Sequence, residues 1–144
     1  MDVRGVAHRG YFGAITDFKS YYEANQALLD YKTAASLVSN SWPIHTRTND
    51  SCPTQYFETA NVKSSLVSNG CLIEGTLVNC VVGRGCQIKK GAVVKNCIVL
   101  PGVTIGANVH LENLVVDKHA TITRVKEIIA NPDNPEYIRR NDIL

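Results

Sequence analysis

The sequence has no long hydrophobic run. None of its 144 residues belongs to a stretch approaching the roughly 18 consecutive apolar residues that suggest a membrane-spanning helix. Residues 1–10 also lack the apolar segment of a secretion signal. We therefore expect a cytoplasmic protein that does not enter a membrane.

A strong charge of one sign is missing as well. The chain has 15 Lys and Arg residues against 13 Asp and Glu residues, which leaves a net charge of +2. The basic residues form no block of the kind that marks a nucleic-acid-binding face or tail. We do not expect nucleic acid as a partner, and the length fits one domain or one domain with a short additional piece.

An internal repeat is the main feature that is present. Residues 78–82, 95–99 and 112–116 read almost alike, and their asparagines, Asn79, Asn96 and Asn113, follow one another at intervals of 17 residues. A fixed period indicates one structural unit stacked on copies of itself.

Aliphatic residues recur once per repeat in three columns. The columns are Val62, Leu77, Val94 and Leu111; Val67, Val82, Val99 and Val116; and Ile73, Ile88, Ile105 and Ile122. Residues two apart on a strand point to the same side, so each short strand sends its aliphatic residue and the smaller residue two positions earlier inward. Three such strands per repeat predict a mainly β fold, a left-handed parallel β-helix of hexapeptide repeats, with glycines at its corners. Some outward positions are apolar and could bind a partner subunit or another domain: Leu72, Val81, Val93, Ile98 and Val115.

The five cysteines include no CxxC pair, so the sequence predicts no zinc site. Four of them, Cys71, Cys80, Cys86 and Cys97, occupy inward positions where the repeat favours a small residue. We expect free, buried thiols in the core.

Residues 1–60 do not repeat. Thr16 or Asp17 is a plausible N-cap for a helix that runs to about residue 30, and a shorter helical stretch is expected near residues 33–38. Residues 10–15 have the composition of a buried strand but no sheet to join. We therefore divide the chain into a helical segment at 1–40, a linker at 41–60 and the β-helix with its tail at 61–144. We expect the helical segment to be the remnant of a larger N-terminal domain that is absent from these residues.

Several segments carry a family resemblance. Residues 11–16 (Tyr-Phe-Gly-Ala-Ile-Thr) and 20–25 (Ser-Tyr-Tyr-Glu-Ala-Asn), the latter followed by Leu28-Leu29, resemble the end of the catalytic domain of bacterial glucose-1-phosphate adenylyltransferase, or ADP-glucose pyrophosphorylase. Residues 42–44 and 53–56 resemble the interdomain linker of that family, and residues 91–106 are similar to its β-helix. The resemblance implies that the chain is the C-terminal part of such an enzyme, which transfers adenylyl from ATP to glucose 1-phosphate in bacterial glycogen biosynthesis. It also implies that the helical segment at 1–40 is left over from an absent α/β nucleotidyltransferase domain, the catalytic-type domain of the family.

One departure from the family pattern concerns catalysis. Ala14 stands where the catalytic subunit has an aspartate that helps to hold Mg²⁺, and a methyl group cannot ligate a hard cation. Glu112 and Asn113 lie near the position of paired arginines that bind effector anions in catalytic subunits. These differences resemble the D-type, non-catalytic regulatory subunit, which pairs with the catalytic subunit in a hetero-oligomer. The resemblance implies no catalytic residue and no cofactor in this chain, with Mg²⁺ confined to the absent catalytic domain.

Candidate effector-binding residues are basic side chains near the linker and the tail. Arginine suits two-pronged contacts with anions, and the histidine beside it could contribute. The candidates are His45, Arg47, Arg124, Arg139 and Arg140. Gly83-Arg84-Gly85 has the form of a glycine loop, but its place between Val82 and Cys86 predicts a coil corner.

An alternative function is a hexapeptide-repeat acyltransferase that uses acyl-CoA. Such enzymes employ a histidine as general base near the coil face. His110 is predicted to face outward in mid-strand, and His119 is predicted to lie at a corner. We favour the regulatory and assembly function, with the catalytic subunit as partner.

Overall fold

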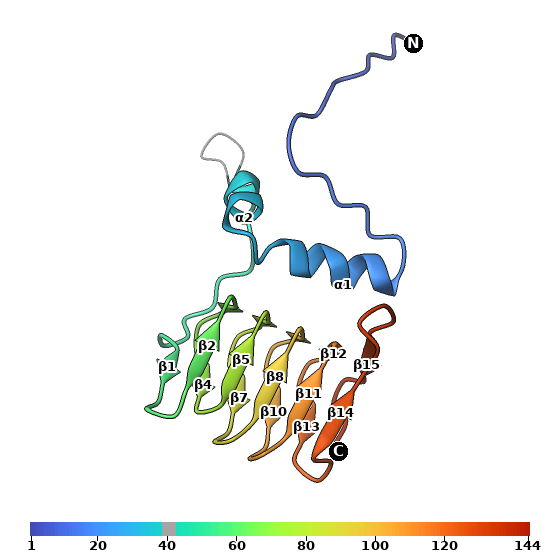
Figure 1. Cartoon of the computed structure of the whole chain (residues 1–144). Helices are drawn as coiled ribbons and strands as arrows, with labels where there is room; N and C mark the ends of the chain where they lie inside the picture. Colours follow the sequence, from blue (N-terminus) through green and yellow to red (C-terminus); the bar gives the residue numbers. More distant parts are fainter. Residues whose placement is uncertain (39–42) are drawn as a thin grey trace.

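The computed structural model describes residues 1–38 and 43–144. Short parallel strands wind into a three-sided solenoid, and two helices precede it (Figure 1). The expected fold, a left-handed parallel β-helix of hexapeptide repeats, is confirmed.

Over residues 43–144, each side of the solenoid is a five-stranded parallel sheet. The first sheet contains β1 (Gln55–Tyr56), β4 (Leu72–Ile73), β7 (Gln87–Ile88), β10 (Thr104–Ile105) and β13 (Thr121–Ile122). The second sheet contains β2 (Asn61–Lys63), β5 (Thr76–Val78), β8 (Val93–Lys95), β11 (His110–Glu112) and β14 (Glu127–Ile129). The third sheet contains β3 (Leu66–Val67), β6 (Val81–Val82), β9 (Ile98–Val99), β12 (Leu114–Val116) and β15 (Glu136–Ile138).

The strand register confirms the three aliphatic columns. In the first sheet, Ile73 pairs with Ile88, Ile88 with Ile105, and Ile105 with Ile122. The columns of the second and third sheets pair in the same way. All four isoleucines are completely buried, so the columns form the continuous core of the solenoid.

The cysteines lie as expected. Cys71, Cys80, Cys86 and Cys97 are buried and free, and Cys52 is free and exposed. Burial raises the pKa of the Cys80 thiol to about 11 and also raises the pKa of Cys97. These two side chains therefore remain neutral at physiological pH and pack as small apolar groups.

The repeated asparagines form a ladder between the second and third sheets. Asn79, Asn96 and Asn113 have φ angles of 53°, 49° and 58°, a left-handed conformation that asparagine tolerates better than most residues. The side-chain amide of Asn79 donates to Asn96 Oδ1 at 3.2 Å, and that of Asn96 donates to Asn113 Oδ1 at 3.1 Å. Asn113 ends the ladder by donating to the Ala130 carbonyl at 2.8 Å. The 17-residue spacing of these asparagines thus arises because the same corner recurs in consecutive coils.

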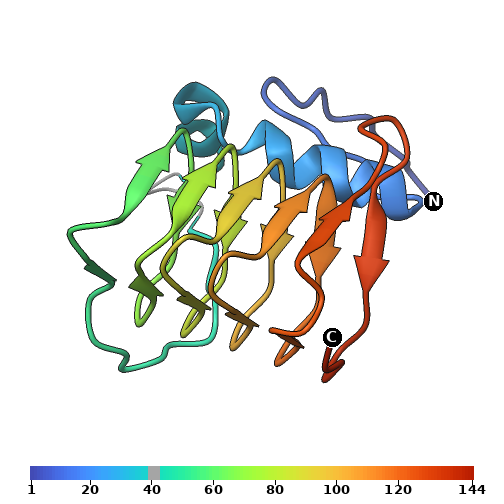
Figure 2. The ribbon, with the colours of Figure 1, turned by 60° about the horizontal axis from the view of Figure 1, so that its bottom comes forward.

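The helix α1 (Phe18–Ala27) lies along the outside of the solenoid (Figure 2). Asp17 is its N-cap, as expected, and accepts a hydrogen bond from the Ser20 amide at 2.7 Å. Tyr22 packs against Ile98 and Val115 on the outer face of the third sheet, and its hydroxyl donates to the Asn96 carbonyl at 2.6 Å. Burial raises the pKa of Tyr22 to about 12.

This contact corrects one expectation about the outward apolar residues. Ile98 and Val115 do face outward, but α1 buries them, so they are not available to another subunit. Leu72, Val81 and Val93 also face outward and are half-buried.

The remaining N-terminal residues differ partly from expectation. Residues 10–15 form no strand, and Phe12 and Ile15 are exposed, so the expectation of a buried strand there is wrong. The second helix, α2 (Tyr31–Leu37), begins two residues earlier than expected. The expected boundary at residues 40–41 and Trp42 lie outside the described residues, and β1 of the first sheet falls within the expected linker. None of the described helices is long and apolar enough to cross a membrane.

A core substitution tests the column that the register defines. We expect Ile88→Ala to reduce the free energy of unfolding by about 2–5 kcal/mol, because it opens a cavity between two stacked coils. Gln87→Ala, a change at an outward position of the same strand, is the control and should leave the urea midpoint nearly unchanged. Unfolding in urea is followed by circular dichroism. Equal urea midpoints for Ile88→Ala and Gln87→Ala would contradict this account of the core.

A second substitution tests the docking of α1. We expect Tyr22→Ala to increase deuterium exchange at the backbone amides of residues 18–27, because the helix loses its buried contact with the third sheet. Exchange in β8 should stay slow. Tyr31→Ala, at an exposed tyrosine of α2, is the control, and helix exchange that is the same in both variants would show that Tyr22 does not hold α1.

Candidate functional site

A groove runs along the corner where strands of the third sheet turn into strands of the first. It has a volume of about 790 Å³, and linker residues form one of its walls. We call it the corner groove; four of its lining residues carry basic side chains, Arg47 from the linker and Arg84, Lys118 and His119 from the coils. Arg84 also joins the two walls, because its Nη1 donates to the Arg47 carbonyl at 3.1 Å.

The basic residues come together because coil corners stack. Each corner has a residue with positive φ whose amide donates to the carbonyl of the preceding coil's corner: Gly102 to Arg84 at 2.9 Å, His119 to Pro101 at 3.1 Å, and Asn141 to Lys118 at 3.1 Å. The residues before these positions therefore form a corner column: Asn69, Arg84, Pro101, Lys118 and Arg140. Neighbouring parallel strands lie about 4.8 Å apart, which separates the backbones of Arg84 and Lys118, two coils apart, by roughly 10 Å.

The corner groove is electrostatically one-sided. No acidic residue lines it, and among residues 1–38 and 43–144 none of its four basic side chains forms an ion pair. Two carboxylates lie next to lining residues in the chain: Asp50, between Asn49 and Ser51, and Asp117, before Lys118. Asp117 accepts hydrogen bonds from the Tyr137 hydroxyl at 2.5 Å and from the Lys118 amide at 2.6 Å. The bond from Tyr137 lowers the pKa of Asp117, so this carboxylate is ionised and keeps its negative charge. The groove suits a small anion with several acceptor oxygens.

The structure distributes the five predicted effector residues over different places. Arg47 lines the corner groove, and Arg140 continues the corner column one coil beyond Lys118, with Arg139 beside it. Arg124 lies at another corner, after β13, where its amide donates to the Leu144 carbonyl. His45 is exposed in the linker and does not line the groove.

Three basic residues of the groove, Arg84, Lys118 and His119, were not among the predicted effector ligands. The sequence correctly indicated that Gly83-Arg84-Gly85 is a coil corner. It did not indicate that the Arg84 side chain lines the same groove as Lys118. Their spacing in the chain, two repeats of 17 residues, is the signal that could have found them.

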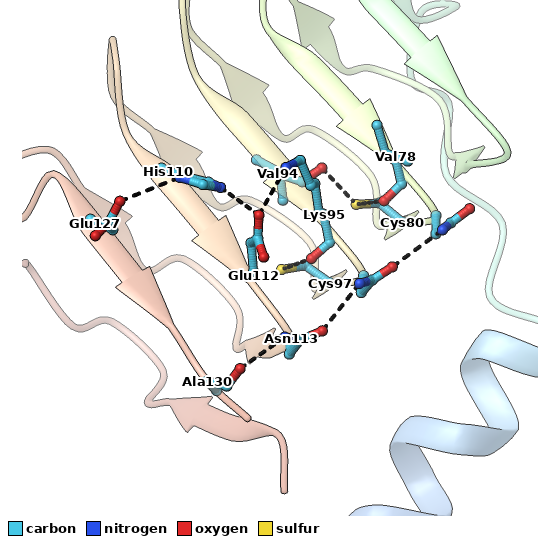
Figure 3. Close-up of polar contacts among 12 residues, drawn as sticks. Val78, Cys80, Val94, Lys95, Cys97, His110, Glu112, Asn113, Glu127 and Ala130 are labelled. Atoms are coloured by element: carbon cyan, nitrogen blue, oxygen red, sulfur yellow. Dashed lines mark hydrogen bonds and ion pairs between the residues drawn. The ribbon is translucent and has the colours of Figure 1, made fainter. Parts of the chain in front are cut away.

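His110 belongs to a different cluster, on the outer face of the second sheet (Figure 3). Its Nε2 lies 2.7 Å from Glu112 Oε1, and its Nδ1 lies 3.5 Å from Glu127 Oε2. Lys95 Nζ lies 2.9 Å from the same Glu112 oxygen, and hydrogen bonds from Lys95 and His110 lower the pKa of Glu112. His110 is thus held between two carboxylates, whereas His119, the other histidine considered as a general base, lines the corner groove.

The residues around Ala14 do not fit a magnesium site. Ala14 is exposed, and the side chains of Gly13 and Ile15 on either side of it contain no oxygen. Within the described parts of the chain, no group of three or more His, Cys, Asp and Glu side chains is arranged to hold a metal ion.

Comparison with known proteins agrees with this architecture. The model of the GlmU-like, C-terminal hexapeptide family matches residues 52–138. A glucose-1-phosphate adenylyltransferase from Corynebacterium jeikeium is 31% identical over 117 residues, which cover 80% of this chain and 29% of the relative. Proteins of the same name from Bacillus mycoides and Bacillus cereus are 36% identical over 114 residues, which cover 78% of this chain and 30% of each relative. The chain thus spans less than a third of the length of these relatives, and it belongs to the GlmU-like, C-terminal hexapeptide family as a homologue of part of the glucose-1-phosphate adenylyltransferases.

Proposed function

We propose that this chain is a regulatory and assembly part of a glucose-1-phosphate adenylyltransferase in bacterial glycogen biosynthesis and is not catalytic by itself. The whole enzyme would join ATP and glucose 1-phosphate to form ADP-glucose and pyrophosphate. The corner groove is the observation that carries the proposal, because it is a concave site whose charged lining residues are all basic, on a homologue of such an enzyme. The nucleotide, the sugar and Mg²⁺ would bind in a nucleotidyltransferase domain outside these residues.

The regulatory part of the proposal rests on anion binding in the corner groove. Arg84 and Lys118 can contact two ends of one organic phosphate, because their backbones lie roughly 10 Å apart. Arg47 reaches the same site from the linker. An anion held by all three would fix the linker against the solenoid, and the linker leads directly to α1 and α2. Effector binding could in this way reach the helices and any domain that precedes them.

The assembly part of the proposal rests on surfaces that remain open after α1 has docked. Leu72, Val81 and Val93 face outward from three different sheets and keep part of their surface accessible. Phe12 and Ile15 in the N-terminal segment are exposed apolar residues of a kind that protein contacts bury. We propose a catalytic subunit of the same enzyme as the partner, in a hetero-oligomer.

The acyltransferase alternative has less support. Its general base would be His110 or His119, but Glu112 and Glu127 hold His110, and His119 lies among cations in the corner groove. The relatives described above carry the name of the adenylyltransferase.

Binding of pyrophosphate to the chain tests the corner groove. We expect Arg84→Ala and Lys118→Ala each to weaken binding by about tenfold or more in calorimetry at low salt, because each removes a charged hydrogen-bond donor. Lys32→Ala, at an exposed lysine of α2, is the control and should leave the affinity unchanged. If all three variants bind as the parent does, the groove is not the anion site.

Turnover of the natural subunit that contains these residues tests the non-catalytic assignment. We expect negligible formation of ADP-glucose by this subunit alone, because Ala14 cannot ligate Mg²⁺. Mixing it with a catalytic subunit should yield a stable complex in size-exclusion chromatography. Robust turnover without the partner would contradict the assignment.

A further inference from the structure

We propose that His119 makes anion binding in the corner groove pH-dependent, so that binding strengthens as the imidazole takes up a proton. The inference rests on the proposed anion-binding function and adds to it a proton as a second effector. Histidine is the side chain whose ordinary pKa, about 6.5, lies within the physiological range.

The backbone at residue 119 points to a role for its side chain. His119 has a φ of 61°, and the same corner position holds Gly70, Gly85 and Gly102 in earlier coils. A histidine has a conformational cost there that glycine does not have. The three earlier coils close without a side chain at this position. Coil closure therefore does not require the imidazole.

The imidazole lies where it can meet a bound anion. A Cβ placed on Gly102 would come within 2.3 Å of His119 Nδ1, so the ring covers the backbone of the neighbouring corner. That corner also lines the groove, together with Arg84 and Lys118. The ring thus lies among the basic residues that would hold the anion.

The charges around His119 couple its protonation to anion binding. Arg47, Arg84 and Lys118 place three positive charges around the groove, and the ionised Asp117, two residues before His119, places one negative charge near it. A dianion bound in the groove adds negative charge beside the ring and therefore favours its protonation. Because such coupling is reciprocal, a proton on the ring strengthens binding of the dianion by the same factor.

Few negative charges compete for the imidazolium. Asp117 keeps its negative charge, but each of its two carboxylate oxygens already accepts a hydrogen bond, one from the Tyr137 hydroxyl and one from the Lys118 amide. The other charged residues near this end of the corner, from the linker and the tail, are Asp50, Arg139, Arg140 and Asp142, and none of them lines the groove.

Sulfate is the probe for the test, because it remains a dianion throughout the pH range used. Its affinity for the whole chain is measured by calorimetry from pH 7.5 to pH 5.5 at constant ionic strength. We expect the dissociation constant to fall by about fivefold or more as pH falls, because one coupled proton can change the affinity by up to tenfold per pH unit. Proton uptake on binding should appear as a dependence of the heat on the buffer.

Two substitutions at position 119 separate the charge of the ring from the shape of the corner. His119→Gly and His119→Asn install residues that this corner accepts at Gly102 and Asn141. We expect both variants to lose the pH dependence of sulfate binding, because neither replacement side chain takes up a proton between pH 7.5 and pH 5.5. His110→Asn, at the histidine held by Glu112 and Glu127, is the matched control and should keep the pH dependence.

Proton NMR supplies a readout at the ring itself. The His119 signal is the one of four histidine signals that disappears in His119→Asn, and sulfate should shift this signal while leaving the His110 signal in place. Binding by the parent that is independent of pH, or a pH dependence that survives in both variants at position 119, would overturn the role of His119 and leave the groove in place. If the parent binds neither sulfate nor pyrophosphate at any pH, the anion-binding function fails, and this inference with it.

Discussion

The in-register pairing of equivalent residues from coil to coil is the constraint on which the rest of this molecule depends. Because Ile88 pairs with Ile73 on one side and with Ile105 on the other, a residue type chosen once per repeat recurs about every 4.8 Å along the solenoid. Inside, this rule builds aliphatic columns with small thiols between them. At the corner after the second sheet, the same rule builds the asparagine ladder, in which each side-chain amide donates a hydrogen bond to the side-chain oxygen of the next asparagine. The same rule brings Arg84 and Lys118, far apart in the chain, to one edge.

The outer faces do not follow the repeat so strictly, and there the N-terminal helix determines what is exposed. Ile98 and Val115 would form an apolar stripe on the third sheet if α1 did not cover them. Tyr22 makes this contact specific, because its hydroxyl has one partner, the Asn96 carbonyl at the corner where the asparagine ladder runs. The helix therefore behaves as part of the solenoid domain. It also lies between the linker, which forms a wall of the corner groove, and the exposed N-terminal segment.

The sequence predicted the fold well because burial in a solenoid is periodic. The residues of each column could be aligned by counting, and the register confirms them without a shift. The N-terminal residues were harder, since nothing in a periodic pattern indicates that α1 packs on Ile98 and Val115, or that Phe12 stays exposed. The groove was predicted only in part. Arg47 was selected for its charge, whereas Arg84 was interpreted only as a corner residue. To predict that Arg84 and Lys118 line one groove, the stacking of corners must be followed through two coils.

The corners are the positions at which this fold places the weakest constraint on side-chain type. An inward position must hold an aliphatic or small side chain in each coil, whereas the corner column holds Asn69, Arg84, Pro101, Lys118 and Arg140, which share no chemistry. Asn69, Arg84, Pro101 and Lys118 share a backbone carbonyl that accepts a hydrogen bond from the corner of the next coil, a requirement that any residue type meets. Their side chains are therefore available for binding, as loop side chains are in other folds. The position beside them is less free, because its positive φ favours glycine or asparagine. A histidine there adds conformational cost with no gain for the core, and its ring contributes instead to the basic surface of the groove.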